Sequence, residues 1–186
     1  MLNSQLVLKS TKRAGKYEDA IIGQLQSHFS ELGYETVPHA RFDIAWGSIL
    51  SDVDLLLIKN DQLILVEVKS SRDNLSRAKS QIKEIEDFVD LIYLATDYYP
   101  RKWPSRKAGR IVVKDGQVNI LKEGKPLDKL PKLETLLSLR RESLSKLLGK
   151  SENETKKLTK FQLAIIARET NQHDLKDQLK ELVTCQ

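Results

Sequence analysis

The hydrophobic pattern is most informative in residues 51–71, where two apolar runs are separated by a short polar segment. Val53–Ile58 and Leu63–Val68 are rich in β-branched and aliphatic residues, as buried strands are. Asn60 and Asp61, between the runs, both tolerate the positive φ that a tight turn requires. The pattern therefore predicts a β-hairpin that is symmetric about Asn60 and Asp61.

Both faces of this predicted hairpin are apolar. Residues two apart share a face of a strand, so one face carries Leu56, Ile58, Leu63 and Leu65, and the other carries Leu55, Leu57, Ile64, Val66 and Val68. A hairpin that is apolar on both sides is typical of the centre of a sheet that is covered on each face.

Three charged residues, Asp54, Glu67 and Lys69, interrupt the apolar runs at one end of the hairpin. In the symmetric register Asp54 lies opposite Glu67, with Cβ atoms roughly 5 Å apart, and Lys69 shares the face of Glu67. Facing carboxylates at the rim of a core need a cation. Oxygen ligands with free positions suit Mg²⁺ or Mn²⁺ and a phosphate substrate. Asp52 shares the face of Asp54, and we interpret it as a supporting residue.

The rest of the chain up to residue 130 alternates helical and strand patterns, which predicts an α/β fold with a mixed central sheet flanked by helices. Pro38 suggests an edge or irregular strand, and Asp115-Gly116 is a strong hairpin signal. The expected elements are a helix at Lys12–Leu32 ended by Gly33, a strand with its connection at Tyr34–Ile44, a helix at Asp73–Val89 capped by Asp73 or Asn74, and strands at Asp90–Thr96, Ile111–Val113 and Val118–Leu121.

Residues 131–186 form a predicted helical extension to the domain of residues 1–130. Helices are expected at Lys132–Leu148, Thr159–Thr170 and Asp174–Val183, separated by Gly149 and a polar stretch. These helices carry too many apolar residues to be exposed all round. They could form a helix-turn-helix-like DNA module, a dimerisation element or a brace against the first domain, and the sequence does not choose.

The segment Tyr98–Arg110 is a candidate nucleic-acid contact. Basic residues interleaved with aromatics suit a contact that follows a phosphate backbone and stacks on bases, although an ordinary solvated loop is equally compatible. The candidate binding residues are Arg101, Lys102, Trp103, Arg106 and Lys107 in this segment, with Lys79 and Gln81 on the preceding helix, where a plain solvated helix face is the simpler interpretation.

Composition narrows the possible functions only modestly. The net charge of +5 permits a nucleic-acid partner without requiring one. A single cysteine, Cys185, excludes an internal disulfide, and with no signal peptide expected at the N-terminus it predicts a cytoplasmic location. No apolar run approaches the roughly 20 residues of a membrane span. His28, His39 and His173 form no metal-binding motif, and no nucleotide-binding motif occurs.

The spacing of Asp54 and Glu67-Val68-Lys69 resembles the core motif of the PD-(D/E)xK, or restriction-endonuclease-like, nucleases, although Val53 stands where the motif has proline. The context of Glu18 is similar to the first helix of archaeal Holliday-junction resolvases. The order of elements after the hairpin is similar to the MmcB-like DNA-repair nucleases.

The resemblance implies that Asp54, Glu67 and the carbonyl of Val68 hold Mg²⁺ or Mn²⁺, and that Lys69 orients water and stabilises charge on the phosphate. It implies that Glu18 holds a second metal ion or a water, whereas the helix pattern alone is equally satisfied by a first-turn glutamate favouring the helix dipole. The expected function is a metal-dependent endonuclease acting on DNA in repair, recombination or restriction, and a homodimer is compatible with it, since two-strand cleavage needs two sites. The alternative is an inactive nucleic-acid-binding or assembly module.

Overall fold

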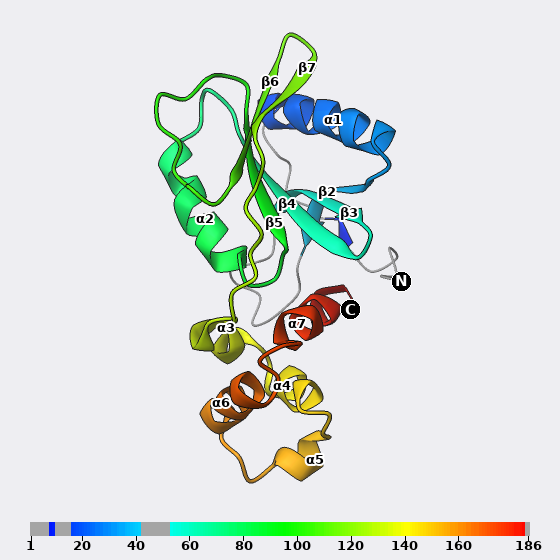
Figure 1. Ribbon diagram of the computed structural model, residues 1–186, viewed down its shortest axis with the longest axis vertical. Coiled ribbons are helices and arrows are strands. Elements are labelled where there is room, and N and C mark those ends of the chain that lie inside the picture. The colour runs from blue at the N-terminus through cyan, green and yellow to red at the C-terminus, as the bar shows by residue number, and fades with distance from the viewer. Residues whose placement is uncertain (1–7, 10–15, 42–52, 185–186) are drawn as a thin grey trace.

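The computed structural model describes residues 8–9, 16–41 and 53–184, so Asp52 and Cys185 lie outside the described residues. It has an α/β fold in which a mixed sheet lies between α1 and α2, with the C-terminal helices packed at one end (Figure 1). The strands are β1 (Leu8–Lys9), β2 (Glu35–Arg41), β3 (Val53–Lys59), β4 (Gln62–Lys69), β5 (Leu91–Thr96), β6 (Gly109–Lys114) and β7 (Gln117–Lys122). The helices are α1 (Lys16–Glu31), the 3₁₀ turn η2 (Leu75–Arg77), α2 (Ala78–Ile85), α3 (Leu133–Ser138), α4 (Arg141–Leu147), α5 (Glu152–Thr155), α6 (Lys160–Thr170) and α7 (Leu175–Thr184).

In the described residues the sheet has seven strands in sequence order. β4, β5 and β6 are parallel to one another, and the other neighbouring pairs are antiparallel. Parallel pairing requires a crossover, which η2 and α2 supply between β4 and β5. The mixed sheet expected from the sequence is therefore confirmed.

The central hairpin has the symmetric register that its turn predicts. Leu55 pairs with Val66 and Lys59 pairs with Gln62. Asn60 and Asp61 adopt φ values of 50° and 62°, so the two-residue turn has the left-handed backbone that suits the twist of the flanking strands.

Two apolar cores cover the two faces of the sheet, as the hairpin pattern predicts. The α1-side core contains Ile21, Ile22, Leu25 and Phe29 of the helix with Leu55, Leu57, Ile64, Val66, Val68, Tyr93, Ala95, Ile111 and Val113 of the sheet. The α2-side core contains Leu56, Leu63, Leu65, Ile82, Ile85, Phe88, Val89 and Ile92, and it continues into the C-terminal helices through Leu136, Leu144, Leu163, Ala167, Leu175 and Leu179.

The C-terminal helices brace the end of the sheet at which β4 and β5 begin. Lys180 on α7 contacts Asp90 with both N–O distances near 3 Å, at 3.0 and 3.1 Å, and Asp90 Oδ2 also accepts a hydrogen bond from Leu63 N. Buried Asp87 accepts hydrogen bonds from Lys132 N and Thr135 Oγ1. These contacts show that the C-terminal helices pack against the first domain, as the brace interpretation requires.

Several helix boundaries differ from those expected. The helix predicted at Lys132–Leu148 is two helices, because Leu139 and Arg140 take extended backbone angles between α3 and α4. The polar stretch after Gly149 contains the short α5, which Ser151 and Glu154 start with a reciprocal capping box. The helix predicted at Asp73–Val89 is shorter and is preceded by η2, whose N-cap is Asn74. No described helix is long and apolar enough to cross a membrane.

Candidate active site

Asp54, Glu67 and Lys69 converge at the end of the central hairpin. Lys69 Nζ lies 2.5 Å from Glu67 Oε1 and donates a second hydrogen bond to the carbonyl of Val68 at 3.0 Å. Asp54 Oδ2 accepts a hydrogen bond from Val68 N at 2.7 Å. The backbone of Val68 thus joins the acid on β3 to the acid–lysine pair on β4.

A change in the course of β3 places Asp54 here. The paired residues of β3 and β4 end at Leu55 and Val66, and Asp54 lies one residue beyond that point. Val53 packs in the α2-side core. Strict alternation along the strand would place it with Leu55 in the α1-side core, because residues two apart share a face. Because β3 turns at Asp54, the Asp54 carboxylate can accept a hydrogen bond from Val68 N. If the strands had stayed paired, Val68 N would donate to the backbone of β3 instead.

Burial controls the charges of the three side chains. Burial, together with the neighbouring Asp54 carboxylate, raises the pKa of Glu67 to about 7 in spite of Lys69. Burial also raises the pKa of Asp54, against the hydrogen bond from Val68 and the charge of Lys69. Burial lowers the pKa of Lys69, but Glu67 and Asp54 outweigh it and hold that pKa above its ordinary value. The site therefore has one buried ammonium, paired with Glu67, and two neighbouring carboxyl groups that each disfavour the ionisation of the other.

A second acidic pair, Glu18 and Asp73, lies beside the first. The charge of Glu18 acts on the pKa of both Glu67 and Lys69, so α1 does bring this residue to the site. Hydrogen bonds from Ser70, together with the interaction with Glu18, hold the pKa of Asp73 below its usual value, although its burial opposes them. Asp73 was expected only as a helix cap. The sequence feature that could have assigned Asp73 to the site is its position shortly after the end of β4, on the loop that leaves the site.

His39 is a further residue that the sequence did not assign to the site. The register of β2 on β3 pairs Pro38 with Leu55 and Ala40 with Val53, which puts His39 opposite Asp54. His39 has a φ of 48°, a strained value for a non-glycine residue, and its Nε2 lies 3.2 Å from Asp19 Oδ1. Its charge opposes the rise in the pKa of Asp54. Strand register, rather than a motif, brings it there.

The proposed metal ligands fit a hard divalent cation in donor type. Asp54, Glu67 and the Val68 carbonyl offer only oxygen atoms, which Mg²⁺ and Mn²⁺ prefer. The hydrogen bonds among the described residues use Asp54 Oδ2 and Glu67 Oε1, which leaves the second oxygen of each carboxylate for a cation. As these residues stand, no group of three or more His, Cys, Asp or Glu side chains within the described ranges is spaced to hold a metal ion. Lys69 contacts two of the three ligands, so a bound cation would have to share them with it or move it.

The basic segment Tyr98–Arg110 runs from the end of the sheet that carries the site to the opposite end. β5 ends at Thr96, which pairs with Lys69, so Tyr98 and the residues after it leave from the site. Gly109 pairs with Tyr93, roughly 10 Å back along the strand, so the segment has returned to the opposite end by then.

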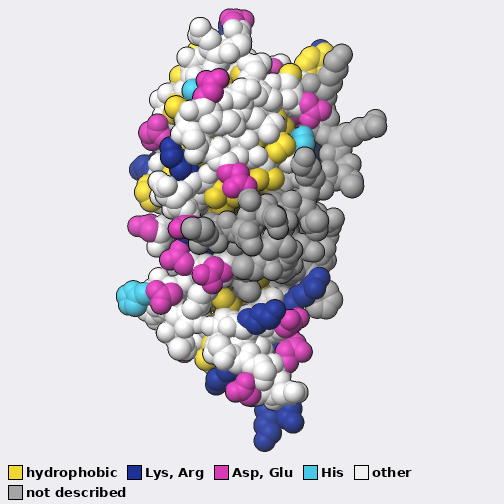
Figure 2. Space-filling model, turned by 90° about the vertical axis from the view of Figure 1, so that its right-hand side faces the viewer, with side chains coloured by type: hydrophobic (Ala, Val, Ile, Leu, Met, Phe, Trp, Pro, Cys, Tyr) yellow, Lys and Arg dark blue, Asp and Glu magenta, His cyan; other side chains and the backbone are white. Residues whose placement is uncertain are grey.

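Of the candidate binding residues, Arg106 and Lys107 lie at that far end, and Lys107 pairs with Glu86 at 2.8 Å. Arg101 and Lys102 are exposed within the segment, and the half-buried Trp103 has the Arg110 guanidinium 5.5 Å from its ring centroid. Lys79 is exposed on α2, and Gln81 is half-buried with an unpartnered Oε1 among the described residues. The structure therefore does not gather the seven candidates into one surface. On the side of the molecule away from α2, Figure 2 shows acidic and basic side chains interspersed.

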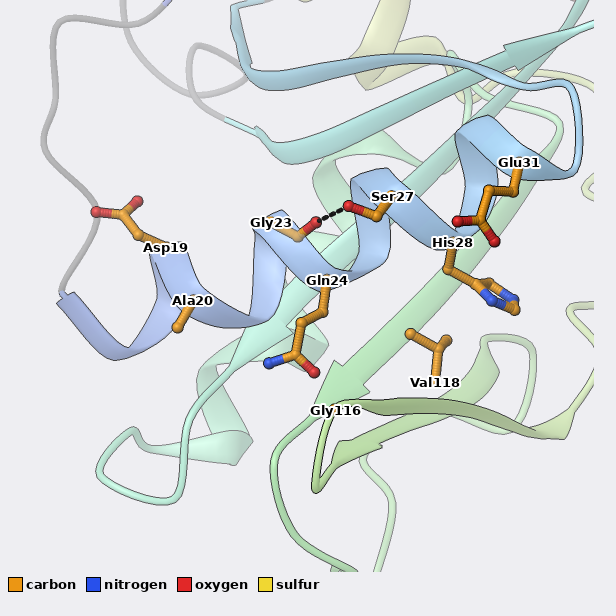
Figure 3. A pocket seen from close by; sticks show the side chains of 9 residues that line it. All are labelled: Asp19, Ala20, Gly23, Gln24, Ser27, His28, Glu31, Gly116 and Val118. Atoms are coloured by element: carbon orange, nitrogen blue, oxygen red, sulfur yellow. Dashed lines mark hydrogen bonds between the residues drawn. The ribbon is translucent and has the colours of Figure 1, made fainter.

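A separate open groove of about 420 Å³ follows the outer face of α1 beside the β6–β7 turn. Figure 3 shows Gln24 and His28 on one side of it and Val118 on the other, with Asp19 and Glu31 near its ends. None of the residues expected at the active site lines this groove.

No protein-family model matches the sequence, and no curated protein matches it either. Among solved structures the chain is similar to SPO1766, a protein of unknown function from Silicibacter pomeroyi, with a TM-score of 0.48 and 16% identity over 74% of this chain and 86% of that one. It is also similar to AF1548, another protein of unknown function, with a TM-score of 0.39 and 14% identity over 91% of this chain and 99% of that one. Similarities this weak carry no argument about function, which has to be argued from the site itself.

Proposed function

We propose that this protein is a nuclease that uses Mg²⁺ or Mn²⁺ to hydrolyse phosphodiester bonds in DNA, as an endonuclease of repair, recombination or restriction. The observation that carries the proposal is the buried ion pair of Glu67 and Lys69 with the half-buried Asp54 bound to the backbone of the intervening Val68. Removing two carboxylates and an ammonium from water costs free energy that a purely structural role does not require. The resemblance to the PD-(D/E)xK nucleases supports the same conclusion.

Asp54, Glu67 and the Val68 carbonyl would hold the cation, and Glu18 would hold a second cation or a water molecule. A bound divalent cation supplies the Lewis acidity that activates water and polarises the scissile phosphate. The raised pKa of Glu67, about 7, means that this ligand set becomes fully anionic only near neutral pH. Binding of a cation would therefore compete with protons at Glu67.

Lys69 has two tasks in this proposal. Its ammonium contacts Glu67 and the Val68 carbonyl, two of the three proposed ligands, so it can donate a hydrogen bond to a water molecule that approaches the phosphate. It also supplies a fixed positive charge where negative charge develops on the phosphate oxygens. Because the pKa of Lys69 is held above its ordinary value, the side chain stays protonated, and it acts through its charge rather than as a base.

The test is cleavage of single-stranded, duplex, flap and four-way-junction DNA with Mg²⁺, with Mn²⁺ or with EDTA. Asp54→Asn, Glu67→Gln and Lys69→Met should each abolish cleavage that the wild type shows. The matched control is Asp61→Asn, because Asp61 is an exposed carboxylate at the other end of the same hairpin and asparagine tolerates its φ of 62°. Cleavage that survives in the three site variants would disprove the site, and binding of DNA without cleavage would favour the inactive-module alternative.

A further inference from the structure

An exposed tyrosine and an exposed arginine are stacked on each other beside the candidate active site. The guanidinium carbon of Arg72 lies 3.9 Å from the ring centroid of Tyr17. Tyr17 is 49% exposed in spite of this contact, and Arg72 is exposed as well. Neither residue belongs to the predicted catalytic motif or to the basic segment. Their contact joins α1 to the loop that follows β4.

The position of this pair relative to the acidic residues is fixed by the chain. Tyr17 immediately precedes Glu18, and Arg72 immediately precedes Asp73. Ser70, the residue after Lys69, donates hydrogen bonds to Asp73 from its backbone N at 2.7 Å and from its hydroxyl, which holds Asp73 at the end of β4. The stacked pair therefore precedes, in each of its two segments, an acidic residue whose charge acts on the Glu67–Lys69 pair or is acted on by it.

A third exposed ring lies on the same side of the site. Tyr99, which is 60% exposed, follows the end of β5, where Thr96 pairs with Lys69. The neighbouring Tyr98 is close enough to Asp73 for that carboxylate to act on its pKa. Aromatic side chains from α1 and from the start of the segment after β5 thus lie near the acidic residues of the site.

Exposed rings beside a phosphodiester-cleaving site bind unpaired nucleotides better than they bind duplex DNA. In a duplex both faces of each base are covered by neighbouring bases, so the protein is offered mainly phosphates. An unpaired nucleotide presents a base face that can stack on an aromatic ring or on a guanidinium plane. A guanidinium that stacks through its face still has its N–H groups at the edge, where they can bind a phosphate oxygen.

We propose that Tyr17 and Arg72 form a clamp for an unpaired nucleotide next to the bond that is cut, which makes single-stranded or branched DNA the substrate class. The clamp deepens the nuclease proposal above and rests on it. Tyr17 supplies the stacking surface, and Arg72 holds the adjoining phosphate. Tyr99 extends the same surface along the strand.

The experiment is a binding titration in EDTA, which prevents metal-dependent cleavage. A labelled single-stranded oligonucleotide and a blunt duplex of the same sequence are titrated with wild type, Tyr17→Ala, Tyr17→Phe and Arg72→Gln. Tyr17→Ala and Arg72→Gln should weaken single-strand binding about 5- to 100-fold and leave duplex binding within about 2-fold. Tyr17→Phe should bind like the wild type, because the ring is kept.

Phe161→Ala and Arg140→Gln are the matched controls. Phe161 is a 53% exposed ring on α6 and Arg140 is an exposed arginine before α4, both in the helices that brace the other end of the sheet. Neither change should alter binding of either DNA. Unchanged single-strand affinity in Tyr17→Ala and Arg72→Gln, or an equal loss for both DNAs, would overturn the clamp.

The two proposals fail in different ways. If wild type cuts no DNA but single-strand binding depends on Tyr17 and Arg72, the nuclease proposal fails and the clamp stands as a binding site. If cleavage requires Glu67 but single-strand affinity is unchanged in Tyr17→Ala and Arg72→Gln, only the clamp proposal is wrong.

Discussion

Lys69 Nζ and Glu67 Oε1 lie 2.5 Å apart, and the two side chains are only 10% and 4% exposed. Glu67 and Lys69 are two residues apart on β4, so strand alternation alone places them on one face. Their burial next to Asp54 gives them properties that can be measured in the absence of any substrate. Three of the predictions below follow from this relationship, and the fourth concerns the other end of the sheet.

The ionisation of Glu67 should make the protein less stable as the pH rises toward neutrality. The folded-state pKa is about 7 and the ordinary value is 4.5, so between them the folded state binds more protons than the unfolded state. The free energy of unfolding then falls as pH increases through this window and levels off above it. Asp54, whose pKa is also raised, contributes in the same direction.

Glu67→Gln should remove much of this pH dependence. The variant should be more stable than wild type at pH 8 by about 1–3 kcal/mol and similar to it at pH 4, because glutamine carries no charge to bury. Urea denaturation across the pH range in EDTA measures both proteins. Parallel pH profiles for the two proteins would show that Glu67 ionises normally.

Mg²⁺ or Mn²⁺ should raise the melting temperature of the wild type, and the effect should grow from pH 6 to pH 8. A cation binds the ionised form of Glu67, and a ligand that binds only the folded state stabilises it in proportion to its occupancy. Asp54→Asn and Glu67→Gln should lose most of the shift, whereas Asp61→Asn should keep it. A shift that is the same in all four proteins would assign the cation to another place.

Lys69→Met should be costly at high pH and much less costly at low pH. Removing Lys69 leaves the Glu67 carboxylate uncompensated and raises its pKa further, and because Glu67 can then take up a proton, the loss at pH 8 should be about 1–2 kcal/mol. At pH 5 Glu67 is protonated and the penalty largely disappears. Adding Glu67→Gln to Lys69→Met should therefore restore stability at pH 8, and a double-mutant cycle by urea denaturation measures the coupling. Additive effects at both pH values would contradict an ion pair.

Asp90→Ala should loosen the C-terminal brace. Asp90 accepts hydrogen bonds from Leu63 N and Lys180 Nζ, so its loss leaves both donors without this acceptor and should cost about 2–3 kcal/mol. Asp177→Ala is the matched control, because Asp177 contacts the same Lys180 at 2.8 Å but is 72% exposed, and it should cost less than about 0.5 kcal/mol. Amide exchange in α7 measures the opening, and equal protection in the two variants would show that Asp90 does not anchor the helix.

Much of the central fold was predictable because its signals are local. The continuous apolar run from Leu55 to Ile58 indicates burial on two faces, and the turn residues Asn60 and Asp61 specify the register of the hairpin. Gly33, with a φ of 81°, ends α1 where the sequence places it. The break at Leu139 and Arg140 was not predictable, because the apolar stripe continues through it and the packing of α3 and α4 on α6 separates the two helices.

By itself the sequence determined the hairpin, the shared face of Glu67 and Lys69, and the mixed sheet, because strand period and turn chemistry act over a few residues. Only the tertiary structure decided that Asp73 and His39 join these residues, that Arg106 and Lys107 lie at the opposite end of the sheet, and that the C-terminal helices act as a brace. Those placements depend on strand order and register between segments far apart in the chain, and the free energy that fixes them comes from burying side chains in two shared cores. No short stretch of sequence contains that information.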